Sequence, residues 1–213
     1  TLEPTVWSER YQRLLQDRFP KGRWLDGMRL VVDCANGAMS ELAPAMLRSL
    51  GAEVCAIQAN PSGTNINEGC GAVHPDSLVE AVGRHRADLG VAFDGDGDRS
   101  LFATADRRLI DGDAVLLLLA RRMKKQGRLG PPTIIGTSMT NYNLELVLES
   151  EGIQLVRVDV GDRNVFEEMR TTGSVLGGEP SGHIIFSDFE LSGDGLLTTL
   201  KVCESLVSEQ RSL

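Results

Sequence analysis

Short apolar runs alternate with amphipathic stretches along most of this sequence, and that alternation limits the folds open to it. RLVVD at residues 29–33 and LGVAF at residues 89–93 have the length and composition of buried strands. The stretches between such runs, for example residues 75–86, carry apolar residues at helical spacing. Strands that alternate with helices through short links form parallel sheets covered by helices. The sequence therefore predicts an α/β fold.

The alternation runs through two cycles, which part at residues 106–108. We expect two consecutive α/β/α domains with mainly parallel sheets. Residues 1–21 are predicted to form an N-terminal helix and linker, residues 22–107 the first domain and residues 108–213 the second. A chain of 213 residues that is 41% apolar is long enough to bury a core in each.

The charge of the sequence argues against several classes of partner. Asp and Glu number 30 against 22 Lys and Arg, which gives a net charge of −8. An acidic surface repels phosphate backbones and anionic lipids, so we expect no nucleic-acid or membrane partner. The longest apolar run, residues 114–120, is far shorter than the roughly 20 residues that span a bilayer. No signal peptide is visible, and four scattered cysteines without a CxxC pair indicate reduced thiols in a cytoplasmic protein.

The most specific motif is DGDGDR at residues 94–99, directly after the apolar run LGVAF. Asp94, Asp96 and Asp98 alternate with glycines, which let the backbone curl so that the three carboxylates can converge. Converging carboxylates repel one another unless a cation lies between them. Hard oxygen ligands favour Mg²⁺ or Ca²⁺. We therefore expect a divalent-metal site at the carboxyl end of a strand, where α/β proteins place their ligands.

Three other interpretations of DGDGDR are considered, of which one is excluded and two stay open. An EF-hand loop needs Gly at its sixth position and Glu at its twelfth, where this sequence has Arg99 and Ala105, so it is excluded. A haloacid-dehalogenase-type phosphatase, which uses an Asp-x-Asp pair after a strand with the first Asp as nucleophile, stays open. A solvated acidic turn also stays open, although solubility alone does not explain glycines interleaved after an apolar strand.

A second motif, GGEPSGH at residues 177–183, places Glu179, Ser181 and His183 on alternate positions. A carboxylate, a hydroxyl and an imidazole along one side of a loop can hydrogen-bond a polyol. His183 can also move a proton near neutral pH. A glycine-rich turn with an exposed histidine gives the same pattern without any function, so this motif is a weak signal in isolation.

A third motif, VGDRNV at residues 160–165, opens a further predicted helix. Asp162 is expected at the N-cap of that helix, where a carboxylate accepts hydrogen bonds from free main-chain N–H groups. Arg163 falls in the first turn. Capping accounts for Asp162, whereas Arg163 is a candidate to bind an anion.

Together these stretches resemble the α-D-phosphohexomutase family over nearly the whole chain, at the second and third of that family's four domains. DGDGDR resembles the family's magnesium loop, and GGEPSGH its sugar-specificity loop. NINEGCGAVHP, GTSMTNYNLE, VGDRNV and SGDGLLT are most similar to the branch that acts on glucosamine phosphates. Branches that act on glucose or mannose phosphates often carry a lysine where this chain has TSM at residues 137–139, which also favours the glucosamine branch.

The resemblance implies a cofactor and a reaction. Mg²⁺ would be the cofactor, and its ligands would be Asp94, Asp96 and Asp98. The reaction would move a phosphoryl group between O6 and O1 of a hexosamine phosphate, from glucosamine 6-phosphate to glucosamine 1-phosphate, through a phosphoserine of the enzyme.

The resemblance also implies which residues act on the substrate. Arg99 and His183 would be catalytic, Arg99 by stabilising the transferring phosphoryl group and His183 as an acid or base near the reacting oxygen. Glu179, Ser181 and His183 would bind the sugar. Arg163 would bind an anionic group of the substrate.

Two family motifs do not occur in this sequence. The family's phosphorylated serine lies in a Ser-His-Asn-Pro loop of the first domain, and an Arg-x-Ser-Gly-Thr loop of the last domain binds a substrate phosphate; neither is found here. We therefore expect the first and fourth domains of the same polypeptide as partners, and no mutase activity from this chain alone. A homodimer, a glucose- or mannose-phosphate mutase, a sugar phosphatase and a non-catalytic sugar-phosphate-binding module stay open.

Overall fold

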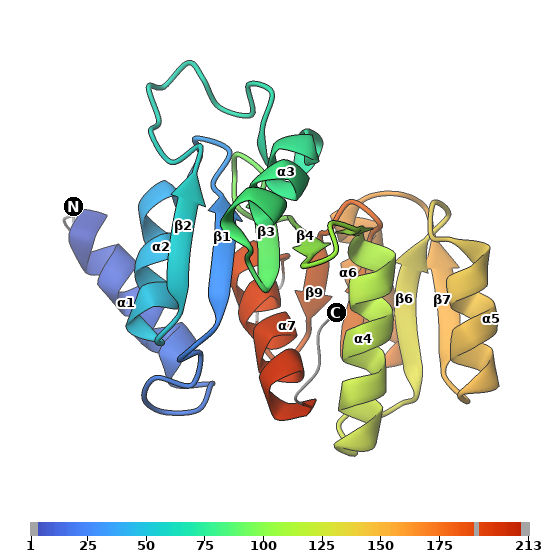
Figure 1. Cartoon of the computed structure of the whole chain (residues 1–213). Helices are drawn as coiled ribbons and strands as arrows, with labels where there is room; N and C mark the ends of the chain where they lie inside the picture. Colours follow the sequence, from blue (N-terminus) through green and yellow to red (C-terminus); the bar gives the residue numbers. More distant parts are fainter. Residues whose placement is uncertain (1–3, 190–191, 210–213) are drawn as a thin grey trace. The chain divides into compact units, whose positions relative to one another are not determined.

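The computed structural model of this chain describes residues 4–189 and 192–209 (Figure 1). They divide into two compact units. The first unit takes in the chain up to Gly97, Ala103–Leu109 and the residues from Leu206, and the second takes in Asp98–Phe102 and Ile110–Ser205. The division therefore cuts the DGDGDR loop between Gly97 and Asp98. The predicted limits of the two domains stay a prediction.

Helices and strands alternate along the described residues. The helices are α1 (Pro4–Gln16), α2 (Met39–Ser49), α3 (Asp76–His85), α4 (Gly112–Lys125), α5 (Tyr142–Ser150), α6 (Asp162–Thr172) and α7 (Gly195–Glu209), with a short 3-10 helix η1 (Gly71–Val73). The strands are β1 (Arg29–Asp33), β2 (Glu53–Ile57), β3 (Leu89–Phe93), β4 (Ser100–Thr104), β5 (Leu109–Ile110), β6 (Thr133–Thr137), β7 (Gln154–Val158), β8 (Leu176–Gly178) and β9 (Ile184–Phe186). This alternation confirms the predicted α/β class.

The first sheet has the strand order β2-β1-β3-β4-β5, and β1 lies between β2 and β3 and is parallel to both. Successive residues of a strand face opposite sides of the sheet. Val31 of β1 packs on one side in a buried cluster with Leu78 and Val82 of α3. Figure 1 shows α3 in front of this sheet and α2 behind it. Both faces are thus covered, as the apolar character of β1 and β3 predicts.

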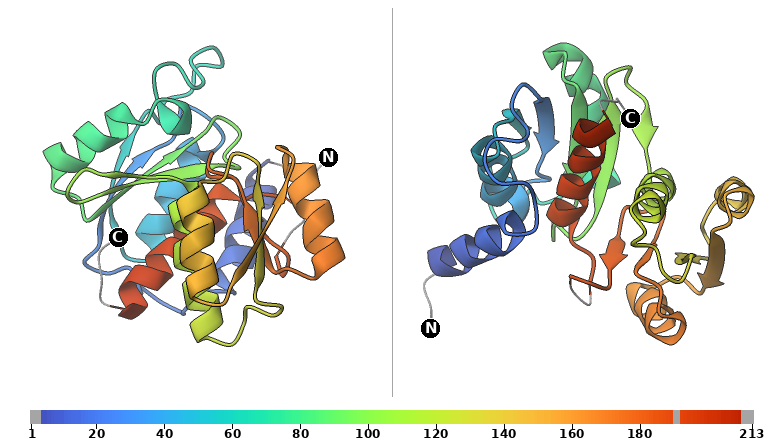
Figure 2. Two further views of the ribbon diagram at one scale, coloured as in Figure 1. Left: turned by 90° about the vertical axis from the view of Figure 1, so that its right-hand side faces the viewer. Right: turned by 90° about the horizontal axis from the view of Figure 1, so that it is seen from below.

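The second sheet has the order β7-β6-β8-β9 and is mixed. β6 is parallel to β7 and β8, whereas β9 runs antiparallel to β8. Val165 and Met169 of α6 form a buried cluster with Ile135 of β6 and Ile185 of β9. Helices α4 and α5 lie on the other side of the sheet, as the left view of Figure 2 shows. The carboxyl ends of β6 and β8 therefore open at one edge between two helical layers.

One local expectation differs from the structure, and one short strand was not predicted. The glycines of GGEPSGH were expected in a loop, but Gly177 and Gly178 belong to β8, which pairs with β9 as a hairpin. Strand β5, of two residues, had no periodic pattern that could predict it. None of the helices in the described part of the chain is long and apolar enough to cross a membrane.

Candidate active site

The first half of the DGDGDR loop belongs to the first unit and leaves β3 at Asp94. This side chain is buried, and its Oδ1 accepts a hydrogen bond from the Gly97 N–H at 3.0 Å. The next carbonyl, of Gly95, accepts from the Ala38 N–H at 2.9 Å, which ties the loop to the segment that follows β1. Asp96 lies between these anchored positions and is exposed. The backbone of the predicted metal loop is therefore fixed while one of its carboxylates faces solvent.

A buried carboxylate that the sequence reasoning missed, Asp33 at the end of β1, organises the neighbouring loops. Its Oδ1 accepts from the Ala35 N–H at 2.9 Å, and its Oδ2 accepts from the Gly71 N–H and the Ser77 hydroxyl, both at 3.0 Å. Asp33 is fully buried. The sequence did carry a signal: Asp33, like Asp94, is an acidic residue at the end of an apolar run.

The second half of the DGDGDR loop belongs to the second unit, where Asp98 meets the imidazole of His183. Asp98 Oδ2 lies 3.1 Å from His183 Nδ1, and His183 is only 4% exposed. His183 Nε2 accepts a hydrogen bond from the Gly193 N–H at 3.0 Å, so the ring proton is assigned to Nδ1 from these partners. The main chains of Arg99 and His183 form an antiparallel β-bridge. The metal loop and the sugar loop predicted from the sequence therefore meet at Asp98 and His183.

Close main-chain approaches hold the GGEPSGH loop in place. The Ser100 N–H donates to the Gly182 carbonyl at 3.1 Å, and a Cβ on Gly182 would lie 2.3 Å from the Ser100 carbonyl oxygen. At the start of α4, the Gly112 N–H donates to the Pro180 carbonyl at 3.0 Å, and a Cβ there would lie 1.9 Å from the Glu179 carbonyl oxygen. Only glycine fits at these two contacts.

The predicted sugar-binding pair, Glu179 and Ser181, is brought together. Glu179 Oε1 accepts from the Gly161 N–H at 3.1 Å, and Oε2 accepts from the Ser181 hydroxyl at 3.3 Å. Gly161 is the N-cap of α6 with φ of 130°, so the carboxylate bonds to the positive end of that helix. The expected N-cap role of Asp162 is wrong, because Asp162 is the first helical residue. Each Glu179 oxygen keeps capacity for a further hydrogen bond.

Both arginines predicted to contact the substrate lie on the surface of the second unit. Arg163 is exposed, and its Nε lies 2.8 Å from Glu167 Oε1 one turn further along α6. This hydrogen bond raises the pKa of Arg163. Arg99 is also exposed. Their predicted roles stay predictions, and an anion at Arg163 must share the guanidinium with Glu167.

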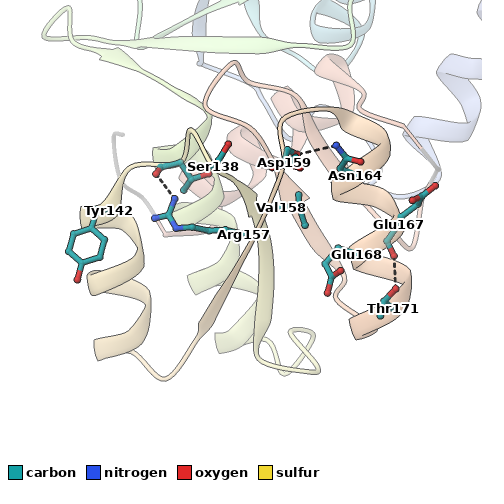
Figure 3. A pocket seen from close by; sticks show the side chains of 10 residues that line it. Ser138, Tyr142, Arg157, Val158, Asp159, Asn164, Glu167, Glu168 and Thr171 are labelled. Atoms are coloured by element: carbon teal, nitrogen blue, oxygen red, sulfur yellow. Dashed lines mark hydrogen bonds between the residues drawn. The ribbon is translucent and has the colours of Figure 1, made fainter.

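A cavity of about 930 Å³ opens at the carboxyl ends of β6 and β7 (Figure 3). Its lining is Ser138, Thr140, Tyr142, Arg157, Val158, Asp159, Asn164, Glu167, Glu168 and Thr171. Arg157 is already engaged, because it donates to the Thr140 carbonyl at 2.6 Å and to Glu145 at 2.9 Å. With Arg157 occupied and three acidic side chains in the wall, the cavity suits hydroxyl groups better than a phosphate. Glu179, Ser181 and His183 do not line it.

The side chains of the predicted metal ligands suit a divalent cation in their chemistry. Within residues 4–189 and 192–209, no group of three or more His, Cys, Asp or Glu side chains is arranged to hold a metal ion. The donors are hard carboxylate oxygens, as Mg²⁺ prefers. Asp98 Oδ1 is buried and has no hydrogen-bond partner among the described residues. A buried carboxylate oxygen without a partner fits a bound cation, so the assignment of Asp94, Asp96 and Asp98 stays a prediction.

Comparison with known protein families also divides the chain into two parts, with limits that differ from those of the two compact units. Residues 9–107 match the profile described as "Phosphoglucomutase/phosphomannomutase, alpha/beta/alpha domain II". Residues 111–213 match the profile of alpha/beta/alpha domain III of the same family. The chain belongs to the phosphoglucomutase/phosphomannomutase family. The resemblance drawn from DGDGDR and GGEPSGH is therefore confirmed.

Individual relatives show which members of the family this chain is similar to. The chain is 52% identical over 202 residues to a phosphoglucosamine mutase from Gluconacetobacter diazotrophicus, covering 95% of this chain and 45% of the relative. It is 48% identical over 202 residues to the phosphoglucosamine mutase of Rhodospirillum rubrum, with the same shares of 95% and 45%. A crystal structure of a phosphoglucomutase/phosphomannomutase family protein from Burkholderia thailandensis has a TM-score of 0.83 at 29% identity, over 94% of this chain and 44% of that one. The chain spans less than half the length of these relatives.

Proposed function

We propose that this chain is the metal-binding and sugar-binding part of a phosphoglucosamine mutase, which converts glucosamine 6-phosphate to glucosamine 1-phosphate. The observation that carries the proposal is the meeting of the two motif loops inside the second unit, with Asp98 Oδ2 3.1 Å from His183 Nδ1. The 52% identity to the Gluconacetobacter diazotrophicus phosphoglucosamine mutase supports this choice of substrate class.

In the proposed reaction the DGDGDR loop handles the phosphoryl group. Asp94, Asp96 and Asp98 hold Mg²⁺, which when bound supplies positive charge to the phosphoryl oxygens. Arg99 follows the last of these ligands in the chain and is exposed. Its guanidinium stabilises the negative charge that spreads over the transferring group in the transition state.

The GGEPSGH loop handles the sugar. Glu179 accepts hydrogen bonds from sugar hydroxyl or amino groups, because each of its oxygens has only one partner among the described residues. Ser181 adds a hydroxyl beside it. His183 acts as an acid or base only if the contact with Asp98 or the bond from Gly193 is exchanged for one to the substrate. Arg163 binds an anionic group together with its partner Glu167.

We propose further that the chain works with a first and a fourth domain of the same polypeptide, which supply the phosphoserine and a second phosphate anchor. The length of the relatives supports this, since the chain covers 45% of the Gluconacetobacter diazotrophicus protein. The chain alone is then inactive as a mutase. Homodimer formation and cytoplasmic location stay predictions from the sequence.

A chimera tests the proposed function. The chain replaces the matching segment of the Gluconacetobacter diazotrophicus phosphoglucosamine mutase, and ³¹P NMR follows glucosamine 6-phosphate, glucose 6-phosphate and mannose 6-phosphate in parallel with Mg²⁺. We expect glucosamine 6-phosphate to be converted fastest, and Asp98→Asn to lower turnover by about 100-fold or more. A folded chimera that prefers another sugar phosphate, or converts none while the parent enzyme does, contradicts the proposal.

The same spectra separate the two alternatives that the sequence left open. A phosphatase of the haloacid-dehalogenase type releases inorganic phosphate from these substrates, and the 213-residue chain does so without further domains. A non-catalytic binding module shifts the substrate resonances and forms no product. We expect neither result, because the chain belongs to a family named for mutases.

A further inference from the structure

We infer that His183 is a positioning residue for the metal ligand Asp98: its Nδ1–H holds Asp98 Oδ2, so that Oδ1 is left for the divalent cation. The inference rests on the proposed metal site. In this task the ring acts through Asp98, and the task is distinct from the acid or base role proposed above.

The first argument is that both nitrogens of His183 are used inside the protein. Nε2 accepts from the Gly193 N–H at 3.0 Å, which fixes the ring proton on Nδ1. Nδ1 lies 3.1 Å from Asp98 Oδ2, and the ring is almost completely buried. Partners on both sides set the tautomer and the orientation of the ring, as a residue that orients a metal ligand requires.

The second argument is that the main chain fixes the position of the ring. The β-bridge between Arg99 and His183 joins the residue after Asp98 to the backbone of His183 itself. On the far side, a Cβ on Gly193 would lie 2.6 Å from His183 Nε2, so the glycine allows the backbone to reach the ring edge. His183 therefore cannot turn away from Asp98 without breaking the bond from Gly193.

The third argument is the state of Asp98. Its side chain is 37% exposed overall, yet Oδ1 is buried and lacks a hydrogen-bond partner in the described parts of the chain. Leaving a buried carboxylate oxygen unpaired costs free energy unless a cation or another donor meets it. A carboxylate with one oxygen bonded to the protein and the other unpaired is arranged as a metal ligand whose orientation is set before the ion binds. Orienting partners of this kind typically change metal affinity by roughly 10- to 100-fold.

Two variants of similar size separate positioning from simple loss of the ring. In His183→Asn the side-chain amide lies near the place of Nδ1 and can donate to Asp98. In His183→Gln the amide lies one carbon further out, near the place of Nε2, and faces Gly193 instead. Mn²⁺, followed by the EPR signal of the free ion, is titrated into the 213-residue chain and both variants, with Asp98→Asn as the reference for a lost site.

We expect His183→Asn to bind Mn²⁺ nearly as well as the original chain, and His183→Gln to bind roughly 10- to 100-fold more weakly. Gly193→Ala, which leaves both side chains of the pair intact, is expected to weaken binding in the same direction because its Cβ displaces the ring. Circular dichroism checks that each variant is folded. Equal affinities of the Asn and Gln variants, whether both high or both low, overturn the inference.

Failure of the inference and failure of the proposed function have different signatures. If the original chain binds no Mn²⁺, the metal site of the proposed function is lost and the inference falls with it. If the chain binds Mn²⁺ and the two His183 variants behave alike, only the inference falls. If the affinity series is as expected but the chimera converts no sugar phosphate, the inference stands and the proposed reaction is wrong.

Discussion

Asp33 at the end of β1 in the first unit and Asp98 of the DGDGDR loop in the second are both carboxylates, but their hydrogen bonding differs. Asp33 is fully buried and accepts from two main-chain N–H groups and the Ser77 hydroxyl. Asp98 has one oxygen 3.1 Å from His183 and a second that is buried with no hydrogen-bond partner in the described residues. Asp33, whose two oxygens both accept hydrogen bonds, shapes the fold, whereas the unpaired oxygen of Asp98 is a candidate to bind a cation.

The largest effect is expected at the satisfied carboxylate. Asp33→Ala removes the acceptor of three hydrogen bonds and leaves two buried N–H groups without that acceptor. We therefore expect a loss of about 3 kcal/mol or more in the free energy of unfolding. Urea unfolding followed by circular dichroism measures it. Asp26→Ala is the control, since Asp26 is exposed and its ion pair with Arg23 is worth about 0–1 kcal/mol. Equal losses in the two variants would remove the structural role assigned to Asp33.

Replacing a helix glycine by alanine is expected to change the free energy of unfolding in opposite directions at Gly112 and at Gly83. Gly112→Ala in the second unit puts a Cβ 1.9 Å from the Glu179 carbonyl oxygen, and overpacking of this kind costs about 1–3 kcal/mol. Gly83→Ala in α3 of the first unit meets only the flexible side chain of Arg107 and gains up to about 1 kcal/mol of helix propensity. Thermal unfolding of the two variants gives the signs. A stable Gly112→Ala protein would mean that the GGEPSGH loop is not held as tightly as described.

A further buried carboxylate, Asp113 at the start of α4, sharpens the comparison through pH. Its Oδ2 accepts from the Asn141 N–H at 2.7 Å, while Oδ1 is buried and has no partner in the part of the chain that the structure describes. Burial raises the pKa of Asp113; the Asn141 N–H and Arg157 act in the opposite direction, and Asp111 adds to the rise.

The direction of the pH effect on stability depends on which protonation form of Asp113 the folded state favours. A carboxyl group whose pKa is raised by folding is favoured in its neutral form, so its ionisation destabilises the fold as pH rises above the ordinary range of Asp. We expect Asp113→Asn to have little effect at pH 3 and to stabilise the chain by about 1 kcal/mol at pH 7. Melting temperatures across this pH range measure it. A stabilisation that is larger at pH 3 than at pH 7 contradicts the assignment.

The smallest effect concerns the thiols, where stability is not altered. Burial raises the pKa of Cys34 and of Cys203 to about 12, and burial also raises the pKa of Cys70. Cys55 in β2 is only half-buried. Since the thiolate is the reactive form, a thiol reagent at pH 8 should label Cys55 first and the other three only on unfolding. Four equal labelling rates in the folded chain would contradict the burial of these residues.

Part of this fold could be predicted from the sequence, because some elements are determined by their own residues. Strands β1 and β3 begin and end where predicted, because each is a run of five residues, mostly apolar, bounded by turns. The DGDGDR loop was found because three acids alternating with glycine have few structural explanations. The sequence predicts a loop at the glycines of β8, and this is wrong because pairing with β9, not intrinsic propensity, makes them a strand.

The contacts within the site could not be read in the same way. His183 was expected beside Glu179 and Ser181 along one side of a loop, because its spacing from Ser181 shows nothing about the residues brought to it from elsewhere in the chain. Its partners, Asp98 and Gly193, lie 85 residues before it and ten after it in the chain. Asp33 was missed because strands often end in turns, where a single acidic residue is common and therefore not a specific signal. Long-range packing decides both cases.

The most direct test of the central claim is the number of divalent ions that the chain binds and the carboxylate on which binding depends. Mn²⁺ titration followed by EPR is expected to show one bound ion per chain, lost in Asp98→Asn and kept in Asp113→Asn, whose unpaired oxygen is assigned to burial. Undiminished binding by Asp98→Asn, or loss of binding in Asp113→Asn alone, would contradict the claim that the DGDGDR loop is the metal site.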